Sequence, residues 1–192
     1  MTISPEQTKH LTERAAELMR ELQIPIRDTW KGYDCENLDD KATNGKYAGS
    51  RLLNIEIVPD GTSSALAGPV YEVEGHKSFA HDKFTIHITK KHLHHENVYI
   101  HELVHFLQCT CEEKNETYLP LAAQTYEDYE DYVSQRCEKE AHLTQLNYII
   151  RHEPELIPAP FREKFIKIIK NTTLDDQDFA AICIDAKEMG VI

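Results

Sequence analysis

Residues 94–108 read His-His-Glu-Asn-Val-Tyr-Ile-His-Glu-Leu-Val-His-Phe-Leu-Gln, and they contain one His-Glu-x-x-His motif at positions 101–105. On an α-helix, residues four apart lie about 40° apart around the axis, so His101 and His105 can direct two imidazole nitrogens at one point. That point suits a zinc ion, and Glu102 can reach a water that zinc has acidified without binding zinc itself. The apolar residues predict that the helix is also half buried, with its polar side turned toward a cleft; they are Ile100, Leu103, Val104 and Leu107.

So short a motif can also arise by chance, because the chain contains 11 histidines among its 192 residues. In that case residues 94–108 form a solvated helix, and its histidines match the motif only by coincidence. The setting favours a metal site, since the motif falls on an amphipathic helix and an alternating apolar stretch precedes it. We therefore predict that His101 and His105 bind Zn²⁺, and that His94 and His95 are surface histidines rather than a second metal site.

Length and composition predict a single globular domain spanning residues 1–192. Hydrophobic residues make up 41% of the chain and charged residues 28%, which is ordinary for a folded domain. The 33 acidic and 21 basic residues give a net charge of −12, which argues against a nucleic-acid-binding surface. We expect a protein or peptide partner instead.

The cysteines and the hydropathy predict a cytoplasmic protein. No apolar leader follows Met1, and no run approaches the 18 or more apolar residues of a membrane span. The five cysteines are odd in number and widely spread, which is typical of free thiols in a reducing compartment; they are Cys35, Cys109, Cys111, Cys137 and Cys183. The pair Cys109 and Cys111 lacks a second cysteine pair at zinc-finger spacing, so we interpret both as thiols at a helix end.

Regular structure is predicted before the motif. Ser4 as a cap and Pro5 in the first turn begin an N-terminal helix within residues 1–25, which Pro25 ends. Alternating apolar residues predict three strands, which form a small sheet within residues 50–90; they span 53–58, 70–73 and 83–89. Residues 28–49 carry turn signals, and we predict little regular structure there.

Helical periodicity continues after the motif, so the metal-site helices are predicted within residues 92–150. One long helix is expected over residues 129–150, with one face made by Val133, Cys137, Ala141, Thr144 and Tyr148. Two further helices, within residues 159–189, are expected to cover the core. Their apolar markers are Phe161, Phe165, Ile168 and Ile169 for the first, and Phe179, Ile182, Cys183 and Ala186 for the second. The fold class is α+β.

A third metal ligand must come from another element, because a catalytic zinc normally takes three protein ligands and leaves the fourth position to water. The helix over residues 129–150 offers Glu138, Glu140 and His142. Glu138 and Glu140 point to different faces of that helix, so only one of them can serve.

The two motifs together resemble those of the zincin metallopeptidases of the glutamate-zincin class, in particular short bacterial and phage-type domains. The motifs are His101-Glu102-Leu103-x-His105-x-x-Gln108 and Glu138-x-Glu140-Ala141. The resemblance implies that Glu138 is the third ligand and that Ala141 lets the two helices approach. Where such families often carry an aspartate that orients a metal histidine, this chain has His142, which could bind zinc directly.

The same resemblance implies a minimal zincin fold, with a small mixed or antiparallel sheet packed on the motif helix and on a second ligand-bearing helix. Strand 83–89 would be the sheet edge to which an extended peptide adds as one more strand. The implied activity is zinc-dependent hydrolysis of a specific intracellular protein or peptide, by an endopeptidase rather than an exopeptidase.

In that reaction Glu102 takes a proton from the water and returns it to the leaving amine, and a tyrosine could donate to the developing oxyanion. The candidate tyrosines are Tyr126, Tyr129 and Tyr132. Two alternatives stay open: a metal-binding adaptor or regulatory domain without catalysis, and a helical interaction protein without metal.

Overall fold

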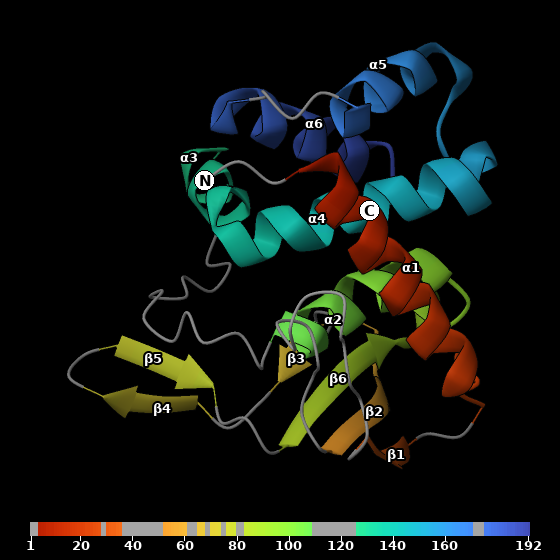
Figure 1. Cartoon of the computed structure of the whole chain (residues 1–192), viewed down its shortest axis with the longest axis vertical. Helices are drawn as coiled ribbons and strands as arrows, with labels where there is room; N and C mark the ends of the chain where they lie inside the picture. The colour runs from red at the N-terminus through yellow and green to blue at the C-terminus, as the bar shows by residue number, and fades with distance from the viewer. Residues whose placement is uncertain are drawn as a thin grey trace. The chain divides into compact units, whose positions relative to one another are not determined.

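Helices and strands are both present, so the α+β class is confirmed (Figure 1). The computed structural model describes residues 4–27, 30–35, 52–60, 65–67, 70–73, 76–79, 83–108, 126–170 and 175–192. The chain divides into two compact units, one made of Ala15–Tyr118 and the other of Met1–Arg14 with Leu119–Ile192. Helix α1, Pro5–Glu21, contributes residues to both units. That residues 1–192 form a single domain stays a prediction.

A mixed four-stranded sheet forms the base of the unit at residues 15–118. Its strands are β1 (Trp30–Asp34), β2 (Leu52–Val58), β6 (Lys83–Thr89) and β3 (Ala65–Ala67), in the order β1-β2-β6-β3. Strands β2 and β6 are parallel, whereas β1 and β3 are antiparallel to their neighbours. A separate hairpin joins β4 (Val70–Val73) and β5 (His76–Phe79). All three predicted strands are therefore present, but β4 pairs with β5 and is not part of the four-stranded sheet.

Two predictions about this sheet were wrong. Strand 83–89 is not an edge, because β6 pairs with β2 on one side and β3 on the other. Its Phe84, Ile86 and Ile88 are fully buried, as an interior strand requires. Strand β1 lies in residues 28–49, where little regular structure was expected. Its five residues include an exposed Trp30 and a glycine, and backbone pairing with β2 rather than an apolar pattern holds it in the sheet.

The motif helix is α2, Glu96–Gln108, and it is more deeply buried than its amphipathic pattern predicts. Nine of its 13 residues are buried. It contacts β3 and β6, and the rings of Phe84 and Phe106 meet edge to face with centroids 6.3 Å apart. Because packing surrounds most of α2, the side chains that it carries are held on a rigid element. The turn before it leaves His94 and His95 exposed, as predicted.

The other unit is helical. It contains α3 (Tyr126–Ser134), α4 (Arg136–His152), α5 (Ala159–Lys170) and α6 (Asp176–Glu188), with a short 3₁₀ turn, η3 (Pro154–Leu156), after α4. The single helix predicted over residues 129–150 was wrong, because Gln135 has an extended ψ of 137° and separates α3 from α4. Val133 and Ala141 are nevertheless both buried, so the apolar spacing continues across the break. A one-residue break of this kind leaves no mark on the periodicity.

Two apolar clusters hold these helices together. One contains Leu146 and Ile149 of α4, Phe165 of α5, and Ile182 and Ala186 of α6. The other joins α3 to α6 through Tyr129, Val133, Phe179, Ala180 and Cys183. The four apolar positions predicted on α6 are therefore all buried. Phe161 differs, since 38% of its surface is exposed, and the side chains of Ile168 and Ile169 lie outside the described residues.

The side chain of Cys183 is fully buried, and we therefore predict that its thiol reacts slowly. Loss of solvation raises the pKa of its thiol, which keeps it protonated at neutral pH and therefore unreactive. In a variant whose other cysteines are serine, we expect Ellman's reagent to modify native Cys183 about 100-fold or more slowly than unfolded Cys183. A variant retaining only the half-buried Cys137 is the control. Equal rates for native and unfolded Cys183 would contradict the packing of α6.

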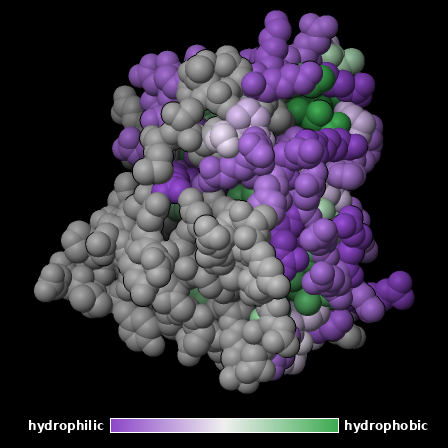
Figure 2. Space-filling model, in the orientation of Figure 1, coloured by the Kyte–Doolittle hydropathy of each residue, from purple (hydrophilic) through white to green (hydrophobic). Residues whose placement is uncertain are grey.

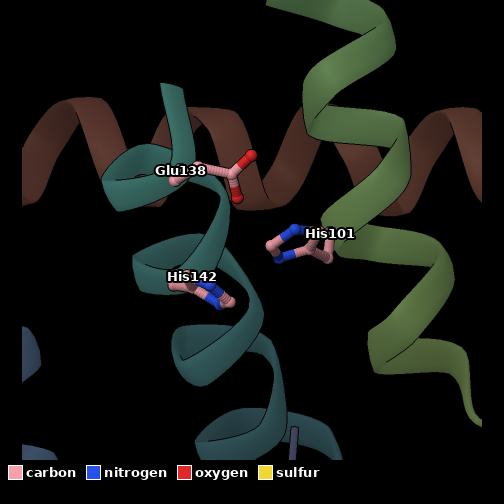
Figure 3. A group of neighbouring side chains, drawn as sticks. All are labelled: His101, Glu138 and His142. Carbon is pink, nitrogen blue, oxygen red and sulfur yellow. The ribbon is translucent and has the colours of Figure 1, made fainter. Parts of the chain in front are cut away.

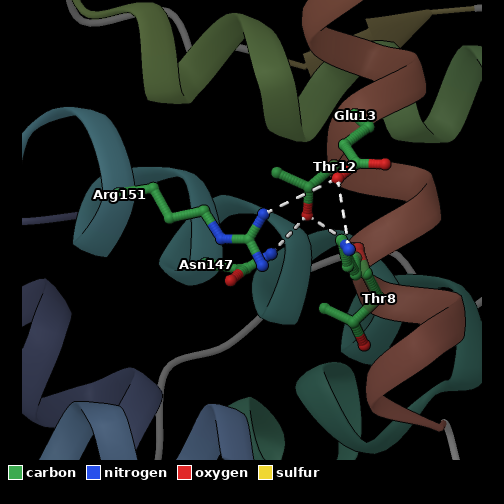
Figure 4. A network of polar contacts seen from close by, with 6 residues as sticks. Thr8, Thr12, Glu13, Asn147 and Arg151 are labelled. Atoms are coloured by element: carbon green, nitrogen blue, oxygen red, sulfur yellow. Dashed lines mark hydrogen bonds and ion pairs between the residues drawn. The ribbon is translucent and has the colours of Figure 1, made fainter.

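A buried polar contact joins the first turns of α1 to α4 (Figure 4). Thr12 donates to the carbonyl oxygen of Thr8 at 2.7 Å, and its hydroxyl oxygen accepts from the Asn147 amide at 2.8 Å. The same two helices are also joined by an ion pair, in which Nη1 of Arg151 lies 4.0 Å from Oε1 of Glu13. Since Thr12 and Asn147 are 2% and 3% exposed, each satisfies the other in place of water.

This contact predicts a non-additive pair of substitutions. Thr12→Val leaves the buried Asn147 amide without this acceptor, which should lower the free energy of unfolding by about 1–3 kcal/mol. The double variant Thr12→Val, Asn147→Leu removes both partners and should lose less than the sum of the two single variants. Urea unfolding of all four proteins measures the coupling. Strict additivity would show that the contact does not stabilise the unit.

The described surface is mostly hydrophilic. On the face drawn in Figure 2, purple side chains cover most of the described residues, and the green hydrophobic side chains are few and scattered. The large apolar side chains that are exposed among the described residues are Trp30, Leu52, Leu156 and Phe161. None of the described helices is long and apolar enough to cross a membrane.

Candidate metal centre

Two imidazole rings of α2 meet edge to face, at the point that the helix spacing predicts. Nε2 of His101 lies 3.1 Å from Nε2 of His105, and the ring planes make an angle of 80°. Two nitrogens bound to one tetrahedral zinc at about 2.0–2.1 Å are themselves about 3.3–3.4 Å apart. The observed separation is within about 0.3 Å of that value, so the two residues fit a shared metal ion. That they bind one stays a prediction.

Gln108 makes a polar contact that was not predicted from the sequence. Its side-chain oxygen Oε1 lies 2.9 Å from Nδ1 of His105. Gln108 stands three residues after His105 on the same face of α2, which is the signal that could have found it. The sequence pattern included Gln108 in the motif string but gave it no role.

Glu102 is buried on the same helix, with 5% of its surface exposed. It directly follows His101 in the chain, and it stands three residues before His105. His101 is also buried, whereas His105 is half buried. A carboxylate shielded from bulk water in this way meets the condition expected for a general base at a metal site.

The three candidate third ligands lie on α4, in the other unit, and all are buried. Glu138 and His142 stand one turn apart and point to the same side of α4 (Figure 3). Glu140 points elsewhere: its Oε1 accepts from Nε2 of Gln7 at 2.7 Å and lies 3.7 Å from Nε of Arg136. These contacts turn the Glu140 carboxylate toward Gln7 and Arg136, whereas Glu138 and His142 share one side of α4.

The candidate donors therefore form two pairs, each on one helix. The structure brings His101 and His105 together on α2, and it places Glu138 and His142 on one side of α4. Figure 3 draws His101 with the α4 pair; all three side chains are buried. Imidazole nitrogens and carboxylate oxygens are the donors that zinc takes in catalytic sites. The donor chemistry and the histidine spacing both fit this metal.

The tyrosines proposed as oxyanion donors have packing roles where they are described. Tyr129 belongs to the cluster between α3 and α6, and Nζ of Lys187 lies 4.7 Å above its ring. Burial, followed by electrostatic interaction with Cys183 and Glu138, raises the pKa of its phenol, so the hydroxyl stays protonated. Tyr132 packs beside it with ring centroids 6.2 Å apart. The side chain of Tyr126 lies outside the described residues.

Comparison of the chain with models of protein families, with curated proteins and with solved structures gave no match. The resemblance to the zincins therefore rests on the His-Glu-x-x-His motif of α2 and the glutamate of α4 alone.

Proposed function

We propose that the chain is a zinc-dependent hydrolase of peptide bonds in which His101, His105 and Glu138 hold the metal and Glu102 is the general base. The observation that carries the proposal is the 3.1 Å approach of the two Nε2 atoms. Two nitrogens that bind one zinc ion lie at nearly this separation, and both histidines stand on the well-packed helix α2. The buried Glu102, which follows His101 in the chain, adds the carboxylate that hydrolysis requires.

Zinc held by these residues would polarise the scissile carbonyl and lower the pKa of a water molecule toward about 7. Glu102 would accept a proton from the attacking water molecule, whose oxygen would bond to the carbonyl carbon. When the carbon–nitrogen bond breaks, Glu102 returns the proton to the leaving amine. Burial of Glu102 keeps bulk water from competing for that proton. The substrate is a specific protein or peptide rather than any unfolded chain.

Zinc titration of chelator-treated protein tests the metal site. We expect one zinc per chain, strong weakening in His101→Ala and His105→Ala, and unchanged binding in His95→Ala, the control at an exposed histidine just before α2. Incubation of the zinc-loaded protein with peptide libraries then tests hydrolysis, and we expect cleavage within a narrow set of sequences. Absence of zinc binding would overturn the proposal, and broad degradation of casein would contradict the specificity.

A second candidate function is a metal-binding domain without catalysis. The observation in its favour is that α4 offers two donors, Glu138 and His142, one turn apart on one side. Two ligands from each helix would complete four-fold coordination, and zinc sites with four protein ligands are structural rather than catalytic. Such a domain would act as an adaptor or regulatory partner that needs zinc to fold.

Substitution of His142 separates the two candidates. If three ligands hold the metal, His142→Ala keeps both zinc affinity and hydrolysis. If four ligands hold it, His142→Ala weakens zinc binding, and the wild type shows no cleavage of any peptide. The control is His152→Ala, the same change at an exposed position near the end of α4.

A further inference from the structure

We propose that Gln108 is a positioning residue that fixes the tautomer of His105 and so prepares it to bind metal. The inference rests on the proposed zinc site and adds to it the group that supports one of its histidines. The residues concerned all lie on α2, and two contacts join them.

The chemistry of the Gln108 amide decides which ring nitrogen of His105 carries the proton. The contact at 2.9 Å joins Nδ1 of His105 to the oxygen Oε1, and an amide oxygen only accepts hydrogen bonds. Nδ1 must therefore be the donor. In the neutral imidazole this leaves Nε2 without a proton, with its lone pair directed away from Gln108. That Nε2 is the atom that lies 3.1 Å from Nε2 of His101.

The same logic assigns the other ring in the metal-free protein. Since Nε2 of His105 has a lone pair, Nε2 of His101 must carry the proton that joins the two atoms at 3.1 Å. The pair is therefore asymmetric before metal arrives. His105 already presents its lone pair, whereas His101 must move its proton from Nε2 to bind.

Support of this kind matters because the ring partner of a metal-bound histidine sets its orientation and basicity. Loss of such a partner typically costs about 10–100-fold in metal affinity or activity. Gln108 supplies the acceptor from the motif helix itself, one turn after the histidine that it supports.

Nitrogen-15 NMR of the metal-free wild type tests the assignment without relying on activity. We expect His105 to show a protonated Nδ1 and an unprotonated Nε2, and His101 to show the opposite. The variant Gln108→Leu, which has similar size but no acceptor, should lose this preference at His105, and Gln108→Glu should restore it. A wild-type His105 protonated at Nε2 would overturn the inference.

Zinc affinity is the second readout. We expect Gln108→Leu to weaken zinc binding about 10–100-fold, and Gln108→Glu to bind within a few-fold of the wild type. Gln177→Leu is the control, since it makes the same change at an exposed position on α6. Equal affinity of Gln108→Leu and wild type would refute the role of Gln108 while leaving the zinc site intact. A wild type that binds no zinc would refute the proposed function, and the NMR result would still decide the tautomer.

Discussion

Replacing Glu102 by glutamine is expected to lower peptide hydrolysis about 10²–10⁴-fold while the protein keeps its zinc. The amide has nearly the shape of the carboxylate, so the buried position beside His101 can accept it. It cannot take a proton from water at neutral pH, so the step that generates the nucleophile fails. The turnover of a cleaved peptide and the zinc content should be measured on the same sample, because only the first should change.

The control for this experiment is Glu96→Gln, the same substitution at a half-buried position at the start of α2. It should keep both turnover and zinc. Unchanged turnover in Glu102→Gln would remove Glu102 from the mechanism. Loss of zinc in that variant would instead assign Glu102 to the metal ligands.

Replacing Glu138 by glutamine is expected to produce the second large effect, the loss of zinc. Loss of a residue that only supports a metal ligand costs up to about 100-fold in metal affinity. Glu138 would bind the metal directly, so its loss should lower the zinc affinity by more than that. Hydrolysis at limiting zinc should fall with it. Equilibrium dialysis against zinc at a fixed pH gives the affinity, and circular dichroism shows whether α4 is still folded.

Glu140→Gln is the matched control, since it makes the same change two residues along α4. Its carboxylate accepts from Gln7 and lies beside Arg136, so we expect lower stability with zinc affinity unchanged. Loss of zinc in Glu140→Gln but not in Glu138→Gln would contradict the assignment. Loss of zinc in His142→Ala with Glu138→Gln unaffected would make His142 the third ligand.

The type of the elements with a regular apolar pattern could be predicted from the sequence, because burial of one face fixes the spacing of their apolar residues. Their limits were less well predicted, since α1 ends at Glu21 and not at Pro25. Helix α1 begins after Ser4, whose hydroxyl accepts from the backbone N–H of Gln7 at 3.1 Å, as the capping pattern predicts. Strand β6 alternates from Phe84 to Ile88, and every second side chain is fully buried. Helix α2 was found for the same reason, and its histidine spacing followed from helix geometry.

Features that depend on partners elsewhere in the chain could not be predicted. The sequence predicts β6 as an edge because β3, with three residues, is too short to show alternation. Strand β1 is held by backbone pairing, which leaves no pattern in its side chains. The break at Gln135 is a change in one ψ angle between two helices that share an apolar face.

The metal site likewise has features that could be predicted from the sequence and features that could not. The spacing of His101 and His105 is local to one helix, so it could be predicted and is observed. Glu140 could not be set aside from the sequence, because its contact with Gln7 joins residues 133 positions apart. Gln108 was overlooked although it is local, because a glutamine on a helix surface carries no chemical signal until its oxygen is seen against Nδ1 of His105.

Anomalous diffraction at the zinc absorption edge, from crystals of the zinc-loaded protein, tests the central claim most directly. We predict one zinc per chain, bound at about 2.0–2.2 Å by Nε2 of His101, Nε2 of His105 and the carboxylate of Glu138, with one position left to water. No zinc at these residues would contradict the metal site. Zinc with a fourth protein ligand in the water position would contradict the hydrolase.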